Sequence, residues 1–127
     1  MARSATITRM TLLERLALHV GRRVSVSADG FSSEENRLTQ VDRRFMRLGP
    51  QASFVPYTLN EITLYDIPLK QPDTQVSVRV TYRNGAAFTA HLVQVGLDYV
   101  EVIEEIGNTK QRFIVPLNKV ISIEKIN

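Results

Sequence analysis

The chain has 127 residues, 43% of them hydrophobic and 23% charged, with a net charge of +3 and no cysteine. This size and composition fit one compact domain or two very small units packed together, and they argue against a disordered chain. The lack of cysteine excludes disulfides, thiolate metal sites and thiol nucleophiles. Because no window reaches the length of an apolar membrane span and the N-terminus lacks the apolar core of a secretory signal, we expect a cytoplasmic protein without a membrane partner.

Charge is distributed unequally along the chain. The first 50 residues contain nine Arg and no Lys against five acids, whereas residues 51–127 contain seven bases and eight acids. A basic half could contact phosphates, but these Arg are scattered rather than consecutive, and a solvated surface is the simpler interpretation. The Arg that are candidates for nucleic-acid contact are Arg22, Arg23, Arg37, Arg43, Arg44 and Arg47.

Residues 1–22 are predicted to form an N-terminal tail and a short helix. In the segment TLLERLALHVG, Thr11 can cap the first turn while Glu14, three residues later, reaches back to it, which is a capping box. Apolar residues follow at helical spacing, and Gly21 is a natural helix end. The helix should be short and half buried.

After Gly21 the apolar period changes from helical to alternating, which predicts strands. Residues 23–69 contain five short strand segments, RRVSVSA, RLTQV, RFMRL, SFVPY and EITLYDI, and form a first unit. The polar segment 70–75, broken by Pro72, reads as a linker. Residues 76–127 repeat the plan with SVRVTYRNG, FTAHLVQV, LDYVEVIEE, QRFIVPL and KVISIEKI, and Asn84-Gly85 in the first of these is a strong hairpin signal.

The two units are related by an internal repeat. A single offset of 54 pairs Val24 with Val78, Val26 with Val80, Leu38 with Leu92, Gln40 with Gln94, Val41 with Val95, Phe45 with Tyr99, Met46 with Val100 and Leu48 with Val102. A longer turn in the second unit should then shift the offset to 60, placing Val55-Pro56 on Val115-Pro116 and bringing Ile62 and Leu64 near Ile121 and Ile123. Any two β-meanders share alternating apolar residues, but a gapless match over about 25 positions favours a duplicated unit.

The predicted fold is therefore mainly β, with two tandem five-stranded SH3-like antiparallel barrels preceded by a short N-terminal α-helix. The run VSVRVTYRNGAAFTAHLVQVGLDYVEVIEE, followed by QRFIVPLNKVISIEKI, resembles the Sm-like fold of the Sm, LSm and Hfq proteins. The capped helix before RRVSVSADG resembles the helix-first order of that fold. The resemblance covers nearly the whole chain as two tandem copies. The cadence of LVQVGLDYVEV and FIVPL is also similar to that of small Sm-like proteins of uncharacterised role in spore-forming Gram-positive bacteria, some of which are linked with the spore surface.

The resemblance does not extend to the residues with which Sm-like proteins read RNA. Such proteins offer an Asn where this chain has Arg47 in one unit and Glu101 in the other. Their second motif corresponds here to Thr58, Leu59 and Asn60 or to Leu117, Asn118 and Lys119, and the Lys-His pair of Hfq is missing. Uridine-tract binding is therefore not implied. The altered positions form a candidate interaction surface, which comprises Asp98, Glu101, Asn118 and Lys119.

No catalytic constellation is evident in the sequence. His19 and His91 lie in different units without metal-ligand spacing, and the pairs Glu34-Glu35 and Glu104-Glu105 abut turns. Phosphate-cradling, dinucleotide and nucleophile motifs are missing. We expect no enzyme, no cofactor, and no catalytic or metal site.

Two functional classes remain. The first is a non-enzymatic oligomeric scaffold or protein-interaction module, because Sm-like units commonly pair with neighbouring subunits in rings; three chains would supply six barrels. The expected partner is a second copy or another protein. The alternative is RNA or single-stranded nucleic-acid binding by the Arg of the first unit, with Tyr57, Tyr82 or Phe88 stacking on bases.

Overall fold

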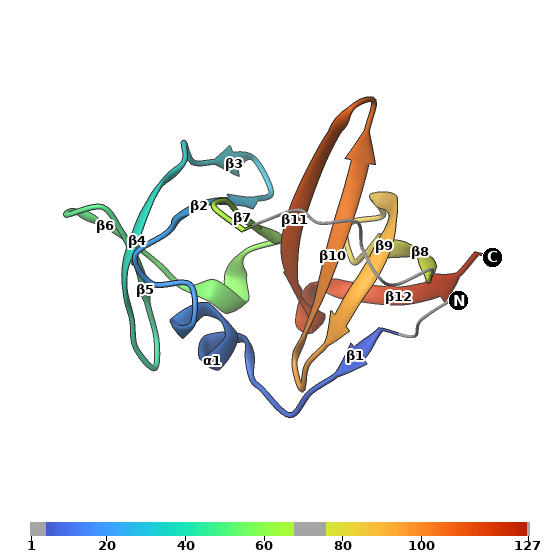
Figure 1. Cartoon of the computed structure of the whole chain (residues 1–127), viewed down its shortest axis with the longest axis horizontal. Helices are drawn as coiled ribbons and strands as arrows, with labels where there is room; N and C mark the ends of the chain where they lie inside the picture. Colours follow the sequence, from blue (N-terminus) through green and yellow to red (C-terminus); the bar gives the residue numbers. More distant parts are fainter. Residues whose placement is uncertain (1–4, 68–75, 127) are drawn as a thin grey trace.

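The computed structural model describes residues 5–67 and 76–126, which contain one short α-helix, two 3₁₀ turns and twelve strands (Figure 1). The elements in chain order are β1 (Thr6–Ile7), α1 (Leu12–Ala17), β2 (Arg23–Ala28), β3 (Phe31–Ser32), β4 (Asn36–Val41), β5 (Met46–Leu48), β6 (Ala52–Phe54), η1 (Pro56–Thr58), β7 (Glu61–Leu64), β8 (Ser77–Tyr82), β9 (Ala87–Val95), β10 (Tyr99–Ile106), β11 (Thr109–Pro116), η2 (Leu117–Lys119) and β12 (Val120–Lys125). The predicted linker, 70–75, lies outside the described residues. Each of the ten predicted segments contains a strand, but only Ser53 and Phe54 of SFVPY lie in one, because η1 begins at Pro56; β1 and β3 are short additional strands.

Helix α1 begins as the sequence predicts. The Glu14 amide donates to Thr11 Oγ1 at 3.2 Å, and the Thr11 amide donates to Glu14 Oε1 at 2.9 Å, which completes the capping box. The helix ends at Ala17, earlier than predicted, and the Gly21 amide donates to the Leu38 carbonyl at 2.8 Å, which directs the chain toward β4.

The strands of the described residues form a single sheet with the order β12-β8-β9-β10-β11-β7-β2-β4-β5-β6, while β1 pairs with β9 and β3 pairs with β2. The prediction of a mainly β chain with one short N-terminal helix is confirmed. The prediction of two separate closed barrels is not, because β7 pairs with β2 of its own half and also with β11 of the other half. The sheet therefore runs from the first half (23–67) into the second (76–126) and stays open at β6 and β12.

Each half contributes the same strand order, β7-β2-β4-β5-β6 and β12-β8-β9-β10-β11. The registers repeat as well. An offset of 54 converts the pair Arg23↔Arg37 into Ser77↔His91 and converts Val41↔Met46 into Val95↔Val100. The register shift between Leu38 and Gln40 recurs between Leu92 and Gln94. The internal repeat is thus a repeat of strand pairing as well as of sequence.

Beyond β5 and β10 the predicted offset of 60 is wrong by one residue. Met46 pairs with Phe54, and the equivalent Val100 pairs with Val115, so the offset is 61. In the same way Val26 pairs with Ile62 and Val80 pairs with Ile123, so Ile62 corresponds to Ile123 and not to Ile121. The additional residues lengthen β10 and β11 to eight residues each, whereas β5 and β6 have three each. The difference therefore lies in the arms of the hairpin rather than in its turn.

Two clusters of buried apolar side chains form the core. The cluster of the second half consists of Tyr82, Ala90, Val100, Val102, Phe113 and Val115. The cluster of the first half is built from α1, β2, β4, β5 and β7, and it also includes Tyr99 of β10 and Ile114 of β11. Since successive residues of a strand point to opposite faces, β10 and β11 face their own half with one side and the first half with the other. The first half therefore completes its core with side chains of the second.

The N-terminal segment connects the halves a second time. β1 runs parallel to β9, with Thr6 opposite Gln94 and Ile7 opposite Val95, and the Leu97 amide donates to the Met10 carbonyl at 2.9 Å. The chain then crosses to α1 in the first half (Figure 1). Within the described ranges, none of the helices is of a length and apolarity that would cross a membrane.

Candidate functional site

A cluster of buried polar contacts lies where the first half covers β10 and β11. Tyr99 and Ile114 are inaccessible to solvent there, and Glu101 is 1% exposed. Arg15 of α1 donates to Glu101 from Nε to Oε1 at 2.7 Å and from Nη2 to Oε2 at 3.2 Å, and Arg112 of β11 donates from Nε to Oε2. Burial alone would raise the pKa of Glu101, but the hydrogen bonds and charges of the two guanidinium groups hold this pKa below its ordinary value. Glu101 is therefore an ionised carboxylate that connects the halves.

Asp98 connects the halves at the adjoining turn. Its Oδ1 accepts from the Leu12 amide at 2.7 Å, at the first turn of α1, and its Oδ2 accepts from the Tyr57 hydroxyl at 2.6 Å. Burial and the hydrogen bond to Asp98 raise the pKa of Tyr57 to about 12. Asn118 Nδ2 donates to the Tyr57 carbonyl at 2.8 Å, so η1 and η2 are also joined.

Two further polar contacts join the halves, one between β8 and β7 and one between the turn that follows β8 and the turn that follows β2. The Tyr82 hydroxyl donates to Glu61 Oε2 at 2.7 Å, and burial followed by the charge of Glu61 raises the pKa of Tyr82. At the predicted Asn84-Gly85 turn, Asn84 Nδ2 donates to Asp29 Oδ1 at 2.8 Å. We call the whole set of contacts between the halves, together with the β7–β11 pairing, the internal junction.

The candidate interaction surface of the sequence analysis falls largely within the internal junction. Asp98, Glu101 and Asn118 contact the first half, and Lys119 accepts from the Arg83 amide through its carbonyl at 3.0 Å. The interpretation of Glu101 as a surface residue is wrong, because the first half of the same chain covers it. Asp98, Glu101 and Asn118 thus already hold a polypeptide partner, which is the other half, whereas Lys119 contacts its own half.

Two of the six candidate Arg of the first half, Arg23 and Arg37, donate to groups of their own chain. Arg23 donates to Asp66 Oδ1 at 2.7 Å and to Glu35 Oε1 at 2.8 Å, and this pairing lowers the pKa of Asp66 to about 2. Arg37 Nη1 donates to the Gly21 carbonyl at 3.0 Å, and Arg22 is exposed directly before β2. The remaining three, Arg43, Arg44 and Arg47, are exposed in or beside the turn between β4 and β5.

Arg44 and Arg47 lie beside an acidic side chain of that turn. Asp42 Oδ1 accepts from the amides of Arg44 and Phe45 at 2.9 and 2.8 Å. These hydrogen bonds lower the pKa of Asp42, with a smaller contribution from the charges of Arg44 and Arg47. A small hollow of about 80 Å³ is lined by Gln40, Asp42, Phe45, Arg47 and Ser53. Phe45, which the repeat pairs with the buried Tyr99, is 43% exposed.

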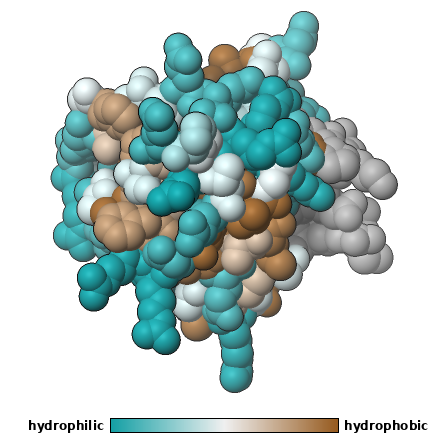
Figure 2. All heavy atoms as spheres, turned by 90° about the vertical axis from the view of Figure 1, so that its left-hand side faces the viewer, coloured by the Kyte–Doolittle hydropathy of each residue, from teal (hydrophilic) through white to brown (hydrophobic). Residues whose placement is uncertain are grey.

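The hollow is the first-half counterpart of the buried part of the internal junction. The offset of 54 relates Gln40 to Gln94, Asp42 to Gly96, Phe45 to Tyr99 and Arg47 to Glu101, and the offset of 61 relates Ser53 to Ile114. We call the side of β5 and β6 that carries Phe45, Arg47 and Ser53 the open face. Figure 2 views the first half from its outer side and shows apolar side chains at the surface among hydrophilic ones.

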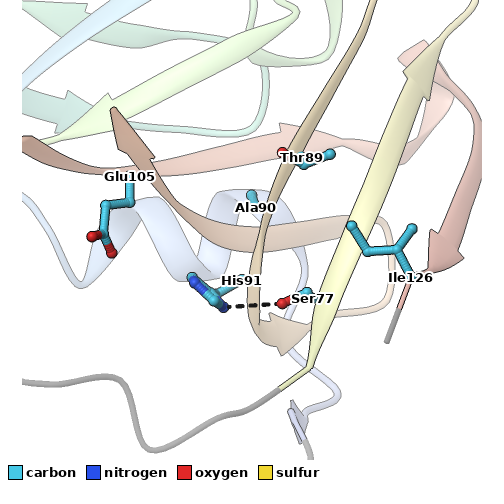
Figure 3. Close-up of a pocket in the computed structure, with 6 residues that line it drawn as sticks. All are labelled: Ser77, Thr89, Ala90, His91, Glu105 and Ile126. Atoms are coloured by element: carbon cyan, nitrogen blue, oxygen red, sulfur yellow. Dashed lines mark hydrogen bonds between the residues drawn. The ribbon is translucent and has the colours of Figure 1, made fainter. Parts of the chain in front are cut away.

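A second hollow, of about 140 Å³, is lined by Ser77, Thr89, Ala90, His91, Glu105 and Ile126 (Figure 3). His91 Nδ1 lies 3.4 Å from Ser77 Oγ, at the long limit of a hydrogen bond. In Figure 3, Glu105 lies on the side of His91 away from Ser77, but among the described residues no hydrogen bond joins it to the imidazole, so the three side chains do not form a connected relay. Among the described residues, no group of three or more His, Cys, Asp or Glu side chains is suited to hold a metal ion.

Sequence reasoning missed the partners that define the internal junction, namely Arg15, Tyr57 and Arg112. They are separated from Glu101 or Asp98 by up to 86 residues, and no local spacing links them. Comparison of the chain with protein-family models, with curated proteins and with solved structures gave no match.

Proposed function

We propose that the protein is a non-enzymatic scaffold or protein-interaction module made of two Sm-like units, which acts by pairing the ends of its sheet with strands of other polypeptide chains. The pairing of β11 with β7 is the observation that carries this proposal. In that pairing the fourth strand of one repeated set of five holds the fifth strand of the other set, Ile114 opposite Ile62. The resemblance to Sm-like proteins, whose units commonly pair in rings, supports the same conclusion.

The strands at the two ends of the sheet, β6 and β12, correspond to β11 and β7 in the repeat but are not paired with a strand of another unit. Among the described strands, β6 pairs only with β5 and β12 pairs only with β8. β6 is the fourth strand of the first set, and β12 is the fifth strand of the second set. A strand edge with unpaired backbone groups is a site for strand addition, by a second copy or by a different protein.

Self-association is the direct test. Size-exclusion chromatography with light scattering at tens of micromolar should give an oligomer, with three chains as the size expected from six units. Ile121 on β12 is 64% exposed, and Ile121→Asp should shift the protein to a smaller species because it adds charge to a strand edge. Ile7→Asp, on β1 at 84% exposure, is the matched control and should leave the size unchanged. A wild-type monomer at this concentration would contradict the oligomeric form of the proposal.

A second candidate is nucleic-acid binding, which the exposure of Arg43, Arg44 and Arg47 around one turn favours. A polarisation titration with a short RNA and with single-stranded DNA at two salt concentrations tests it. Phosphate contacts release counterions, so affinity should fall as salt rises. Absence of binding, or binding without a salt slope, excludes this candidate.

A further inference from the structure

The open face has the strand framework of the internal junction but not its occupant. The registers of β4, β5 and β6 correspond to those of β9, β10 and β11. In the second half this framework holds β7 and α1, and Tyr99 and Ile114 become inaccessible to solvent. In the first half the corresponding Phe45 and Ser53 are exposed. In the second half the framework is therefore covered by a polypeptide, whereas in the first half the same framework is accessible to solvent.

The charges of the open face are the reverse of those in the internal junction. Arg47 takes the place of Glu101, and Arg44 takes the place of Asp98. Glu101 is paired with a guanidinium group of the incoming α1, so the complementary group for Arg47 is a carboxylate. Asp98 accepts from the amide at the first turn of α1, a position at which Arg44 would repel the positive end of a helix. The complement of the open face is therefore acidic and approaches in an extended conformation.

The edge and the apolar surroundings of the open face suit a strand. β6 is the counterpart of β11, which pairs with β7. Phe45 and Val55 beside it are 43% and 42% exposed, and they can cover apolar side chains of an added strand. Arg47 lies opposite Ser53, so an added residue opposite Ser53 would stand in the same row as Arg47 with only a small side chain between them.

A second copy of this chain does not supply the missing carboxylate. Ile62 of β7 corresponds to Ile123 of β12, so a copy that added β12 to β6 in the register of β7 on β11 would place the uncharged Ile123 opposite Ser53. A copy docked by its second half in the manner of the internal junction would thus cover Arg47 without neutralising it. Covering an unpaired charge is costly, so a partner with an acid at this position is favoured.

A polypeptide fits the open face better than a nucleic acid does. The Asp42 carboxylate lines the same hollow as Arg47 and repels any added anion, so it opposes a polyanion with a charge on every nucleotide more than a segment with one carboxylate at Arg47. Two of the other candidate Arg, Arg23 and Arg37, already donate to groups of their own chain. The same framework, in the second half, holds a strand and a helix.

We propose that the open face binds an acidic extended segment of a different protein, which adds to β6 as a strand and places a carboxylate on Arg47. This inference rests on the proposed function and names the chemistry of the partner at one end of the sheet. β12, at the other end, remains an edge for a second copy, but a partner on β6 competes with closure of a ring, in which β6 would pair with β12 of the next chain.

The test uses the strand that the internal junction already holds. A blocked peptide of residues 59–65 with Ile62→Glu is titrated into the ¹⁵N-labelled full chain, and the same peptide with Ile62→Lys is its matched control. In the register of β7 on β11, position 62 of the peptide lies opposite Ser53. The amides of β6 and of Arg47 should shift, and the Glu peptide should bind about fivefold more tightly than the Lys peptide at low salt. Arg47→Glu, which reverses the charge of this exposed side chain, should make the Lys peptide bind more tightly than the Glu peptide.

Three results of the peptide titration would overturn part or all of the inference. Equal affinity of the two peptides at β6 would retain strand addition, and so the proposed function, but overturn the acidic preference. No shift at β6 with either peptide would overturn the inference, while the light-scattering result would still test self-association through β12. Stronger shifts of the same amides by a ten-residue oligothymidine than by the Glu peptide would overturn it in favour of a nucleic acid.

Discussion

The covered side of β10 and β11 in the second half and the open face of β5 and β6 in the first half share their strand registers but differ in surroundings. Tyr99 is inaccessible to solvent, whereas its counterpart Phe45 is 43% exposed. The framework of the repeat thus determines where strands and turns lie, and the residues that differ between the copies determine what each surface contacts. Each matched pair of positions therefore offers a variant in the covered copy and its control in the open copy.

The largest expected effect is at Glu101. Glu101→Gln removes the charge that neutralises Arg15 and Arg112 inside the internal junction, and breaking such a buried arrangement costs about 3–5 kcal/mol. The counterpart Arg47→Gln changes an exposed side chain and should cost less than about 0.5 kcal/mol. Urea unfolding of both variants gives the comparison. Similar losses in the two variants would contradict the distinction between covered and open copies.

The second effect is at Asp98. Asp98→Ala removes acceptors from the Leu12 amide and the Tyr57 hydroxyl, and should lower the free energy of unfolding by about 2–3 kcal/mol. Its counterpart Arg44→Ala should change stability by less than about 0.5 kcal/mol. The ultraviolet titration of tyrosine adds a specific readout, because the pKa of Tyr57, raised to about 12, should fall in Asp98→Ala but not in Arg44→Ala.

Gly96 gives a smaller steric effect. A Cβ at this position would lie 2.0 Å from Cε1 of the buried Tyr99 ring, so Gly96→Ala forces the ring to shift and should cost about 1–3 kcal/mol. The counterpart residue Asp42 carries a side chain without this conflict, because Phe45 is turned toward solvent. Combining Gly96→Ala with Tyr99→Leu should lose less than the sum of the two single changes; strict additivity would refute the proposed steric cause.

The smallest effect is a loss of stability in acid. Burial, together with the charges of Arg15 and Arg22, lowers the pKa of His19, so the unfolded chain takes up a proton more readily than the native chain. Stability should therefore be complete above about pH 6.5 and decrease as the pH falls below it. The lowered pKa of Glu101 adds a second decrease, which begins near its ordinary value of about 4.5. Urea midpoints across this range should lose the upper decrease in His19→Gln, whereas Glu101→Gln should only reduce the lower one, because Asp42 and Asp66 also have lowered pKa values.

Much of the fold was predictable because it depends on local pattern. The capping box around Thr11, the ten alternating segments and the offset of 54 all follow from residues close together in the chain, and the structure confirms them. The later offset was wrong because the hairpin differs in arm length, and apolar matching alone cannot distinguish neighbouring registers when several apolar residues are close together.

The internal junction was not predictable for the opposite reason. Alternation in YVEVIEE assigns Val100 and Val102 to one face and Tyr99 and Glu101 to the other, but nothing in the segment indicates that the second face is covered. The residues that cover it come from α1, 86 positions earlier in the case of Arg15. Only the three-dimensional arrangement of β7 against β11 brings them together.

The sharing of Tyr99 and Ile114 has a consequence for synthesis on the ribosome. Residues 5–67 emerge first, but their core is incomplete until residues more than thirty positions further along have been made. The pairing of β1 with β9 also forms late, because β9 is translated after the whole first half. A nascent chain that ends before β10 should therefore remain sensitive to protease in its first half, and protection of both halves should arise together once β11 has left the exit tunnel.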